Sequence, residues 1–425
     1  MSGTEVVRFL RAADEPLGLF LRPGRSDHRL ICQLLSEGKS GFSGAVFDPT
    51  LVELQQDLKA ELNQRRLWSV LDPFALELSH SGSRTERRRQ LPWAGSRLHS
   101  PADLRGQNGK QLARSIAEFV KQHGFSAVLA PTHYLRNGIS DPWFDTDLGL
   151  AAELKSELAS CGCSDVPIYY PLAIPTNFLF DTHQRTALKK ALKALELDAL
   201  WLRVHPFGGG SGHVTLQRYI HACRDLHELR MPLVAEKAGS IGIPLLVFGA
   251  VSGIELGVSS GEKFDIGRFE EQKKKGKQFA PHRHVYMQNL GVFLKPSLAQ
   301  EFLENRVIRG QHQCANPECC RRGAVDMVKN PRRHFLISRM TELAAISSVP
   351  TSLRASLYLD RYLRPATDKL GRAAQAVVSE DVKAKMGLDR RKLDGWRETL
   401  GQMHSIEPLG STTVPPSRRI TGARA

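Results

Sequence analysis

Residues 231–264, MPLVAEKAGSIGIPLLVFGAVSGIELGVSSGEKF, decide the fold. Two short apolar runs in this stretch, PLVA at 232–235 and ELGVS at 255–259, are typical of buried strands. The residues at 241–253 between them are apolar almost all round, which indicates a helix buried between layers. Short apolar strands that alternate with helices predict a parallel sheet covered by helices.

The same alternation continues on both sides of this stretch. Five further strands are predicted before it and one after it, at residues 44–47, 68–71, 125–130, 166–171, 200–204 and 284–294. With the two strands of the first stretch they make eight, the number that closes a barrel. We therefore predict an α/β fold, a (β/α)8 TIM-type barrel at residues 41–306, with an open doubly wound sheet as the alternative.

Four other segments complete the predicted organisation. Residues 1–40 are hard to place; residues 5–21 fit a strand or a short helix, and the segment is expected to pack on the outside of the barrel. Residues 307–348 carry cysteines and histidines, and residues 349–410 show helical periodicity. These two ranges predict a metal-binding subdomain and a mainly helical extension. The basic tail at 411–425, STTVPPSRRITGARA, lacks a core-forming pattern and is expected to be disordered.

The chain is strongly basic. Its 59 Lys and Arg against 44 Asp and Glu give a net charge of +15, and basic runs occur at residues 84–89, 273–277, 332–333 and 390–392. Such a balance favours a polyanionic partner. We expect a nucleic acid, tRNA or DNA, rather than an anionic membrane, because no basic amphipathic helix stands out. Whether the chain forms a homodimer or joins a larger complex stays open.

The hydrophobicity of the chain, its N-terminal residues and its cysteines indicate the cellular compartment. No stretch approaches the roughly 20 apolar residues that cross a membrane. The N-terminus, MSGTEVVRFLRAADEP, carries acids where a signal peptide would carry an apolar run. Seven cysteines without a framework spacing are more typical of thiols or metal ligands than of disulfides. These features predict a cytoplasmic protein.

Polar residues follow most of the predicted strands and would form a ring at one end of the barrel. Carboxylates that converge there can have their pKa values pushed apart, so that one acts as an acid and another as a base or nucleophile. The catalytic candidates are Asp48, Asp72, Glu236, Lys237 and Glu262, and the substrate-binding candidates are His133, Asn177, His205, Ser260, Gln288 and Asn289.

Structural roles stay open for these residues. Strand ends are also polar because they meet solvent. Asp48 and Asp72 each precede proline, where an aspartate often starts a turn. Lys237 suits an amine nucleophile or an anion clamp, and equally a solvated side chain at the start of a helix.

Two loops have compositions that indicate a ligand or mobility. Residues 206–213, PFGGGSGH, place Gly208, Gly209 and Gly210 before a predicted helix, where their N–H groups could approach a phosphate. A mobile loop without a ligand is the equal alternative. Residues 79–100, SHSGSRTERRRQLPWAGSRLHS, form a long basic loop, and loops of such length are usually functional or disordered.

A group of cysteines follows the last predicted strand. Cys314, Cys319 and Cys320 lie within QHQCANPECC at residues 311–320, and His334 follows them. Three thiolates and an imidazole suit a tetrahedral zinc ion, although the C-x4-C-C spacing differs from the usual C-x2-C. We predict a structural zinc ion here. Buried free thiols, or a cysteine pair that binds together with His312, are the alternatives.

A barrel followed by three cysteines, one histidine and a helix resembles the tRNA-guanine transglycosylase superfamily, including its relatives that insert deazapurines into DNA. The resemblance rests on the architecture and on Cys314, Cys319, Cys320 and His334. It implies two aspartates that exchange a base through a covalent glycosyl intermediate. The family's Cys-x-Cys-x2-Cys becomes CANPECC here, and LDPF at residues 71–74 keeps only the aspartate of its Asp-Ser-Gly-Gly motif.

The resemblance makes Asp72 the expected base and leaves Asp48, Glu236 and Glu262 as candidates for the nucleophile. The leading hypothesis is therefore a nucleic-acid-modifying enzyme, a glycosyltransferase that exchanges guanine or deazaguanine in tRNA or DNA. One alternative is a barrel hydrolase or lyase that acts on a small phosphorylated or sugar substrate. The other is a non-catalytic nucleic-acid-binding subunit of a modification or defence complex.

Overall fold

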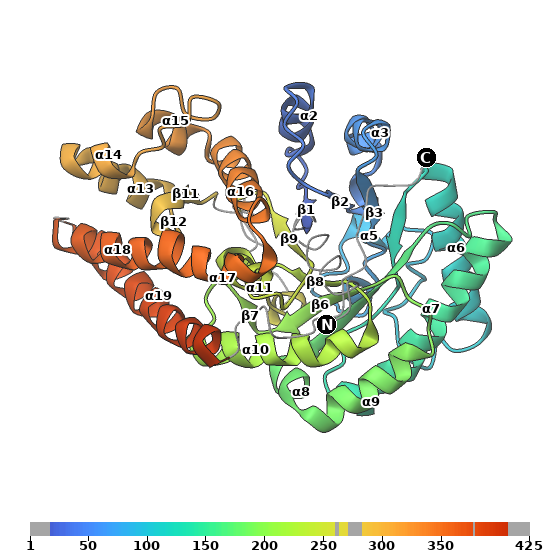
Figure 1. Ribbon diagram of the computed structural model, residues 1–425. Coiled ribbons are helices and arrows are strands. Elements are labelled where there is room, and N and C mark those ends of the chain that lie inside the picture. The colour runs from blue at the N-terminus through green and yellow to red at the C-terminus, as the bar shows by residue number, and fades with distance from the viewer. Residues whose placement is uncertain (1–17, 260–262, 271–282, 377–378, 407–425) are drawn as a thin grey trace, which may run out of the picture.

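Eight parallel strands close a barrel in the order β1-β2-β3-β4-β5-β6-β8-β9 (Figure 1). The computed structural model describes residues 18–259, 263–270, 283–376 and 379–406. The barrel strands are β1 Gly18–Arg22, β2 Gly44–Phe47, β3 Trp68–Leu71, β4 Ala127–Leu129, β5 Ile168–Pro175, β6 Ala199–His205, β8 Leu233–Glu236 and β9 Gly253–Gly257. The predicted TIM-type barrel with a mainly helical C-terminal region is confirmed.

The eighth barrel strand lies at the opposite end of the chain from the one we predicted. Residues 284–294 form a hairpin outside the barrel, in which β11 Val285–Met287 is antiparallel to β12 Val292–Leu294. Gly291, with a φ of 65°, completes the turn between them in a left-handed conformation that favours glycine. The prediction of a barrel strand here was wrong because a hairpin with a short turn has the same apolar content as one long strand.

The missing strand is β1, which lies in the segment that we expected to pack outside the barrel. All five of its residues pair with β9, and it also pairs with β2. The barrel therefore begins within residues 1–40 and ends at β9. Pairing partners so far apart in the chain leave no mark on local periodicity, which is why this segment, for which a strand was one of two interpretations, was not assigned to the barrel.

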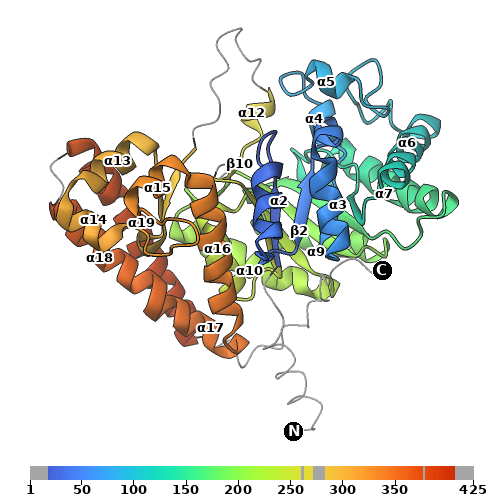
Figure 2. The ribbon, with the colours of Figure 1, turned by 90° about the horizontal axis from the view of Figure 1, so that it is seen from above.

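Helices cover the outside of the barrel (Figures 1 and 2). In α6, Leu112, Ile116 and Val120 repeat every four residues and are buried, and Gly124 ends the helix with a φ of 62°. The barrel region contains α2 His28–Ser36, α3 Gln56–Gln64, α4 Ala75–Leu78, α5 Glu86–Arg89, α6 Gln107–His123, α7 Pro142–Ser160, α8 Thr176–Phe180, α9 Thr182–Lys193, α10 His213–Leu226, α11 Gly242–Val247 and α12 Gly267–Glu270.

Two apolar layers hold the barrel together. Outward-facing strand residues pack against the helices in one large core. Inward-facing residues fill the barrel interior: Phe20, Val46, Trp68, Val70, Ala127, Leu129, Tyr169, Ala199, Trp201 and Val234. Because side chains alternate along a strand, the residue two positions after an inward-facing residue also faces the barrel axis. This alternation decides which side chains reach the end of the barrel.

The C-terminal elements gather on one side of the barrel, away from α6 and α7 (Figures 1 and 2). They are the β11–β12 hairpin, α13 Pro296–Glu304, α14 Arg306–His312, α15 Ala324–Lys329, α16 Pro331–Ser347, α17 Thr351–Tyr358, α18 Arg364–Ala376 and α19 Glu380–Ile406. Helix α19 packs against α18 and against α10 of the barrel.

The predicted tail at 411–425 and the basic run at 273–277 lie outside the described residues. Within the described residues, every helix is too short or too polar to cross a bilayer.

Candidate functional site

Five charged side chains from five strands meet at the carboxyl end of the barrel. We call them the mouth cluster: Arg22 of β1, Asp72 directly after β3, Arg203 of β6, Glu236 of β8 and Glu255 of β9. Strand alternation explains their positions, because four of them come two residues after the inward-facing Phe20, Val70, Trp201 and Val234. Glu255 stands level with Glu236 in the paired strand β9. The apolar interior of the barrel thus ends in a charged layer.

Arg22 links the three carboxylates of the mouth cluster. Its Nη1 donates to Asp72 Oδ2 at 2.8 Å, and its Nε and Nη2 donate to the two oxygens of Glu255 at 3.0 and 2.8 Å. Its Nη2 also lies 3.6 Å from Glu236 Oε2. The paired contact to Glu255 is the planar, bidentate geometry that an arginine supplies and a lysine cannot.

Arg203 is shared by two of the same carboxylates. Its Nη2 donates to Asp72 Oδ2, and its Nε donates to Glu236 Oε2. Lys237 adds a third cation, with Nζ 3.7 Å from Glu236 Oε1. Three carboxylates are therefore matched by three cations, and this balance makes the burial of so many charges tolerable.

Arg22 is the member of the mouth cluster most open to solvent. Its side chain is 17% exposed, whereas the side chains of the other four are at most 4% exposed. A ligand that approaches the cluster from solvent therefore meets the Arg22 guanidinium before it meets a carboxylate.

Burial and the arginines push the pKa values of the carboxyls in opposite directions. Burial alone would raise the pKa of Asp72, but the charges of Arg203 and Arg22 outweigh it and lower this pKa to about 2. Burial is likewise outweighed at Glu236, whose pKa falls below its ordinary value. At Glu255 burial prevails and raises the pKa, helped by the charge of Glu236 and opposed by Arg22. Glu255 is thus the carboxyl of the cluster that is most readily protonated.

The predicted catalytic residues divide into three groups. Asp72 and Glu236 lie in the mouth cluster, and Lys237 lies beside it. Asp48 instead accepts hydrogen bonds from the backbone N–H and the hydroxyl of Thr50, at 2.8 and 2.7 Å, and caps a short helix. This is the turn-starting role that an Asp-Pro sequence favours. Glu262 and the substrate-binding candidate Ser260 lie outside the described residues.

Three predicted substrate-binding residues have different surroundings. His133 is fully buried, and its Nδ1 lies 2.7 Å from Asp147 Oδ1. Asn177 is exposed on α8. His205, the last residue of β6, accepts a hydrogen bond at Nδ1 from the backbone N–H of Ile266 at 3.2 Å. His205 therefore joins the loop after β6 to the loop after β9.

Gln288 and Asn289 were expected at the rim of the barrel, and this placement was wrong. They belong to the short helical turn Gln288–Leu290 between β11 and β12. Asn289 donates to the backbone carbonyl of Gln311 at 2.9 Å. The error follows from the interpretation of residues 284–294 as a barrel strand, because no rim position exists once this stretch forms a separate hairpin.

The glycine loop at residues 206–213 is held by two neighbouring elements. Within it, β7 Phe207–Gly208 pairs with β10 Lys263–Phe264. The carbonyl of Gly209 accepts a hydrogen bond from Lys392 Nζ of α19 at 3.0 Å, and Trp396 of the same helix donates to a second carbonyl of the loop. These contacts dock the loop on the C-terminal region, and a phosphate role for Gly208, Gly209 and Gly210 stays a prediction.

The cysteine–histidine cluster consists of Cys314, Cys319, Cys320 and His334, whose ligand atoms all lie within 4.8 Å of one another. The Sγ atoms of Cys314 and Cys319 are 3.6 Å apart. His334 Nδ1 lies 3.7 Å from Cys319 Sγ and 3.4 Å from Cys320 Sγ. Three sulfurs and one imidazole nitrogen at these separations could hold a metal ion, and this donor set is consistent with zinc.

A backbone carbonyl orients the histidine of this cluster. His334 Nε2 lies 2.7 Å from the carbonyl oxygen of Tyr286 in β11, so Nε2 carries the proton and Nδ1 faces the sulfur atoms. His312, the alternative ligand, points to a different partner, with Nδ1 3.4 Å from Asn289 Oδ1. Helix α16 supplies His334, and the loop before α15 supplies the cysteines.

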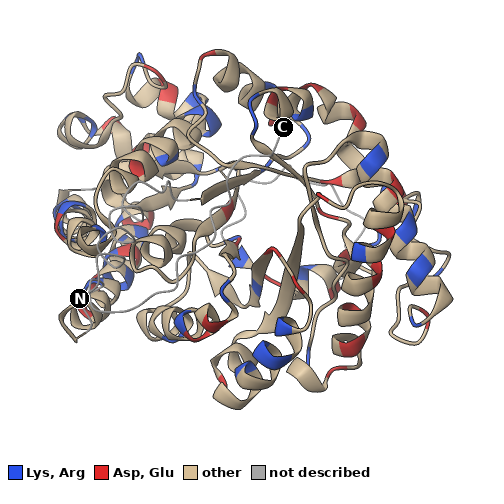
Figure 3. Cartoon of the chain, turned by 45° about the vertical axis from the view of Figure 1, so that its right-hand side comes forward, with Lys and Arg blue, Asp and Glu red and all other residues tan. Residues whose placement is uncertain are grey.

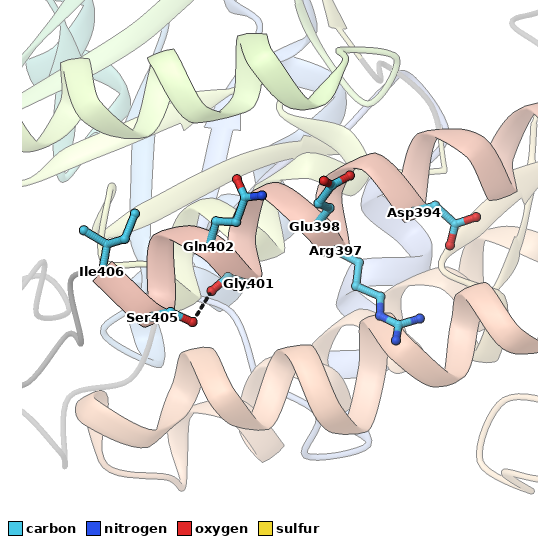
Figure 4. Close-up of a pocket in the computed structure, with 7 residues that line it drawn as sticks. All are labelled: Asp394, Arg397, Glu398, Gly401, Gln402, Ser405 and Ile406. Atoms are coloured by element: carbon cyan, nitrogen blue, oxygen red, sulfur yellow. Dashed lines mark hydrogen bonds between the residues drawn. The ribbon is translucent and has the colours of Figure 1, made fainter.

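A hollow of about 620 Å³ lies along the surface of α19 (Figure 4). Its seven lining residues all come from this one helix: Asp394, Arg397, Glu398, Gly401, Gln402, Ser405 and Ile406. It shares no residue with the mouth cluster or the cysteine–histidine cluster, so we do not assign it to the candidate site.

Arg22, Arg203 and Glu255 were not identified in the sequence. Arg203 and Glu255 stand inside or at the start of predicted strands, where a charged residue is rarely buried unless it is paired. A charge two positions after an inward-facing residue such as Trp201 is the signal that could have revealed Arg203. Arg22 was not predicted because its strand, β1, was not assigned to the barrel.

Comparison with known proteins shows similarity only to solved structures. No protein-family profile and no curated protein matches the chain. A GH18 chitinase from Pseudoalteromonas aurantia is 12% identical at a TM-score of 0.36, over 56% of this chain and 93% of that chain. A GH26 beta-mannanase from Bacteroides ovatus is 13% identical at 0.37, over 66% and 89%. A 2,3-dimethylmalate lyase of the PEP mutase/isocitrate lyase superfamily is 14% identical at 0.28, over 56% and 72%. At TM-scores this low the matches carry no argument about activity.

Proposed function

We propose that the chain is an enzyme that breaks or exchanges a glycosidic bond of a nucleoside within tRNA or DNA. The observation that carries this proposal is the mouth cluster, in which three carboxyls from three strands converge with pKa values pushed apart. Perturbed ionisable groups at the carboxyl ends of barrel strands favour an active site over a purely structural ion pair. The net charge of +15 supports a polyanionic substrate.

The pKa directions suggest different roles for the carboxyls. Asp72 or Glu236, which are held ionised, attacks C1′ of the sugar while the bond from C1′ to the base breaks. Glu255 gives its proton to the nitrogen of the departing base. An incoming base, or water, then attacks C1′ and releases the carboxylate, and Glu255 takes back one proton. Attack by a base gives exchange, and attack by water gives release.

These roles revise the one implied by the resemblance to tRNA-guanine transglycosylases. There Asp72 was the expected base. A carboxyl with a pKa of about 2 accepts a proton poorly near neutral pH, but it is well suited to attack C1′ or to stabilise positive charge there. Glu255 therefore takes the acid–base role in this proposal.

We further propose that the cysteine–histidine cluster binds a structural zinc ion. Four protein ligands would leave no open coordination position, which is typical of structural rather than catalytic zinc. Such an ion would fasten the loop with the three cysteines to α16 and, through His334, to β11. Its proposed contribution is to the stability of the C-terminal region.

The test converts each carboxyl to its amide in the full-length protein: Asp72→Asn, Glu236→Gln and Glu255→Gln. Amides keep the shape of the side chain, whereas alanine would also open a cavity beside the arginines. We expect base release or exchange on tRNA and DNA to fall by about 10³-fold or more for the nucleophile and for the acid. Glu157→Gln is the matched control, because Glu157 is buried and paired with an arginine outside the mouth cluster. Full activity in all three mouth variants would overturn the proposal.

The same assays separate the two alternatives. A hydrolase or lyase that acts on a small sugar or phosphorylated substrate would turn over without nucleic acid and depend little on salt. A non-catalytic subunit would bind nucleic acid without turnover, and the amide substitutions would leave its binding unchanged.

A further inference from the structure

Residues 79–100, which we call the arginine segment, stand out among the basic parts of the chain. Lys and Arg occur all round the barrel and along the C-terminal helices (Figure 3), so charge alone does not identify a binding surface. The arginine segment holds five arginines, no lysine and one acid, includes α5, and follows closely on Asp72. Its position after Asp72 and its arginine-rich composition distinguish it from the other basic parts of the chain.

Buried contacts fasten the inner side of the arginine segment to the barrel. Trp93 is 3% exposed, and its Nε1 donates to the carbonyl of Pro73 at 2.8 Å. His99 Nε2 lies 3.1 Å from the carbonyl of Trp93, and His99 Nδ1 lies 3.4 Å from His133 Nε2. His133 makes two contacts of 2.7 Å to Asp147, one through its backbone N–H and one through its ring. The segment is thus held beside the mouth cluster.

Two of the five arginines shape the segment. Arg84 donates to the carbonyls of residues 94–96 and so closes the loop on itself. Arg88 donates to the carbonyl of Ser83 at 2.6 Å, and its guanidinium lies 4.6 Å from the centre of the Phe74 ring. The backbone N–H of Phe74 in turn donates to Asp72 Oδ1 at 3.1 Å. A short chain of contacts therefore connects α5 with a carboxylate of the mouth cluster.

The other three arginines, Arg87, Arg89 and Arg97, are exposed. Arg89 lies 3.9 Å from Glu86, and this pair contributes little because both side chains are mostly in solvent. The side chains of Arg87 and Arg97 make no hydrogen bond or ion pair to other described residues. The outward face of the segment therefore presents guanidinium groups that are available to an anion.

We infer that the arginine segment binds the phosphate groups of a nucleic acid whose nucleoside enters the mouth cluster, an inference that rests on the proposed function. Guanidinium groups contact phosphate oxygens in pairs, which suits arginine better than lysine. A segment that is already fixed loses little conformational entropy when it binds. Leu98 is the one large apolar side chain exposed within residues 79–100, which is too little apolar surface for a membrane anchor.

The experiment compares Arg87→Glu/Arg97→Glu with wild type in binding of labelled single-stranded DNA and tRNA between 50 and 200 mM salt, a range chosen to resolve counterion release. We expect the Kd of the variant to rise by about tenfold. The slope of log Kd against log salt should fall by about 1.4, or about 0.7 for each lost phosphate contact. Both substituted side chains are exposed, so the unfolding temperature should stay at the wild-type value.

Lys190→Glu/Lys193→Glu is the matched control, because it makes the same charge change at exposed positions of α9, which precedes β6 at the other end of the barrel. Its Kd should change by less than about twofold. Equal losses in the two double variants would overturn the inference, and so would wild-type binding to phosphatidylserine vesicles with none to nucleic acid. Failure of the proposed function would appear separately, as full activity of all three amide variants, Asp72→Asn, Glu236→Gln and Glu255→Gln.

Discussion

The mouth cluster and the cysteine–histidine cluster bring polar residues together in opposite ways. The bond from Arg22 to Glu255 joins residues 233 positions apart, whereas Cys319 and His334 are 15 positions apart. The first cluster exists only when the barrel is closed, because β1 must pair with β9. The second needs one stretch of chain and, in our proposal, a zinc ion. Perturbing each cluster should therefore affect a different part of the molecule.

The two clusters also differ in what neutralises their charges. The carboxylates of the mouth cluster are matched by Arg22, Arg203 and Lys237, all parts of the chain itself. The thiolates of the cysteine–histidine cluster would be matched by the metal. Loss of one arginine removes part of the positive charge that neutralises the mouth cluster. Loss of the metal would remove all of the positive charge that neutralises the thiolates of the cysteine–histidine cluster.

Removal of the metal should have the largest effect. Structural zinc has apparent binding free energies of about 10–16 kcal/mol in small zinc domains. A chelator, or Cys319→Ser, should therefore unfold the region from β11 to α16 while the barrel stays folded. Hydrogen exchange mapped along the chain, together with elemental analysis, measures this. Cys161→Ser is the control, because Cys161 is a half-buried thiol outside the cluster. Exchange that is the same with and without chelator would refute the structural role.

Loss of an arginine from the mouth cluster should have the next largest effect. Arg203 is 3% exposed and is shared by Asp72 and Glu236, so Arg203→Met leaves buried carboxylates without enough positive charge. We expect the free energy of unfolding to fall by about 3–5 kcal/mol in urea titrations at pH 7. Arg114→Met removes a half-exposed partner of Glu157 and should lower the free energy of unfolding far less, because solvent screens this pair. Equal losses of unfolding free energy in the two variants would mean that the burial of Arg203 does not increase its contribution to stability.

The pH dependence of stability should show the contribution of the ionised Asp72 carboxylate, which is smaller than the effect of losing Arg203. Its folded-state pKa of about 2 lies below the ordinary 3.8, so ionised Asp72 stabilises the fold above about pH 4, and this contribution is lost as the pH falls toward 2. The contribution is about 2 kcal/mol, since one pKa unit corresponds to about 1.4 kcal/mol. Asp72→Asn should be less stable than wild type by that amount at pH 7.

This difference should shrink as urea titrations are repeated at lower pH. Glu255 should show the opposite sign, because its raised pKa makes its contribution present at low pH and lost as the pH rises through the folded-state value. Glu255→Gln should therefore gain stability relative to wild type as the pH rises. A difference between Asp72→Asn and wild type that is constant with pH would show that Asp72 is not held ionised by its arginines.

The sequence was informative where a strand and its polar end are local features. Asp72 and Glu236 were predicted because each directly follows or ends a short apolar run, at β3 and β8. The run GLFLR of β1 is equally short and apolar, but only its pairing with β9 identifies it as a barrel strand. Residues 284–294 were misassigned for the converse reason, because their apolar content hides the turn at Gly291.

The chemistry of the site depends on distances that no pattern contains. That Glu255 is the readily protonated carboxyl and Asp72 the ionised one follows from burial and from the positions of Arg22 and Arg203. The four residues of the cysteine–histidine cluster were predicted together because they lie close in the chain. The choice of His334 over His312 is explained only by the Tyr286 carbonyl that orients its ring.

The smallest effect should come from the contact between the barrel and the C-terminal region. Lys392 and Lys385 of α19 both pair with Asp389, but only Lys392 also donates to the carbonyl of Gly209, at 3.0 Å. Lys392→Met should therefore lower the free energy of unfolding by about 1 kcal/mol more than Lys385→Met, which serves as the matched control. Hydrogen exchange at residues 207–211 should rise only in Lys392→Met. If both variants behave alike, the glycine loop does not depend on α19, and the two regions that carry the two clusters are more independent than their contacts indicate.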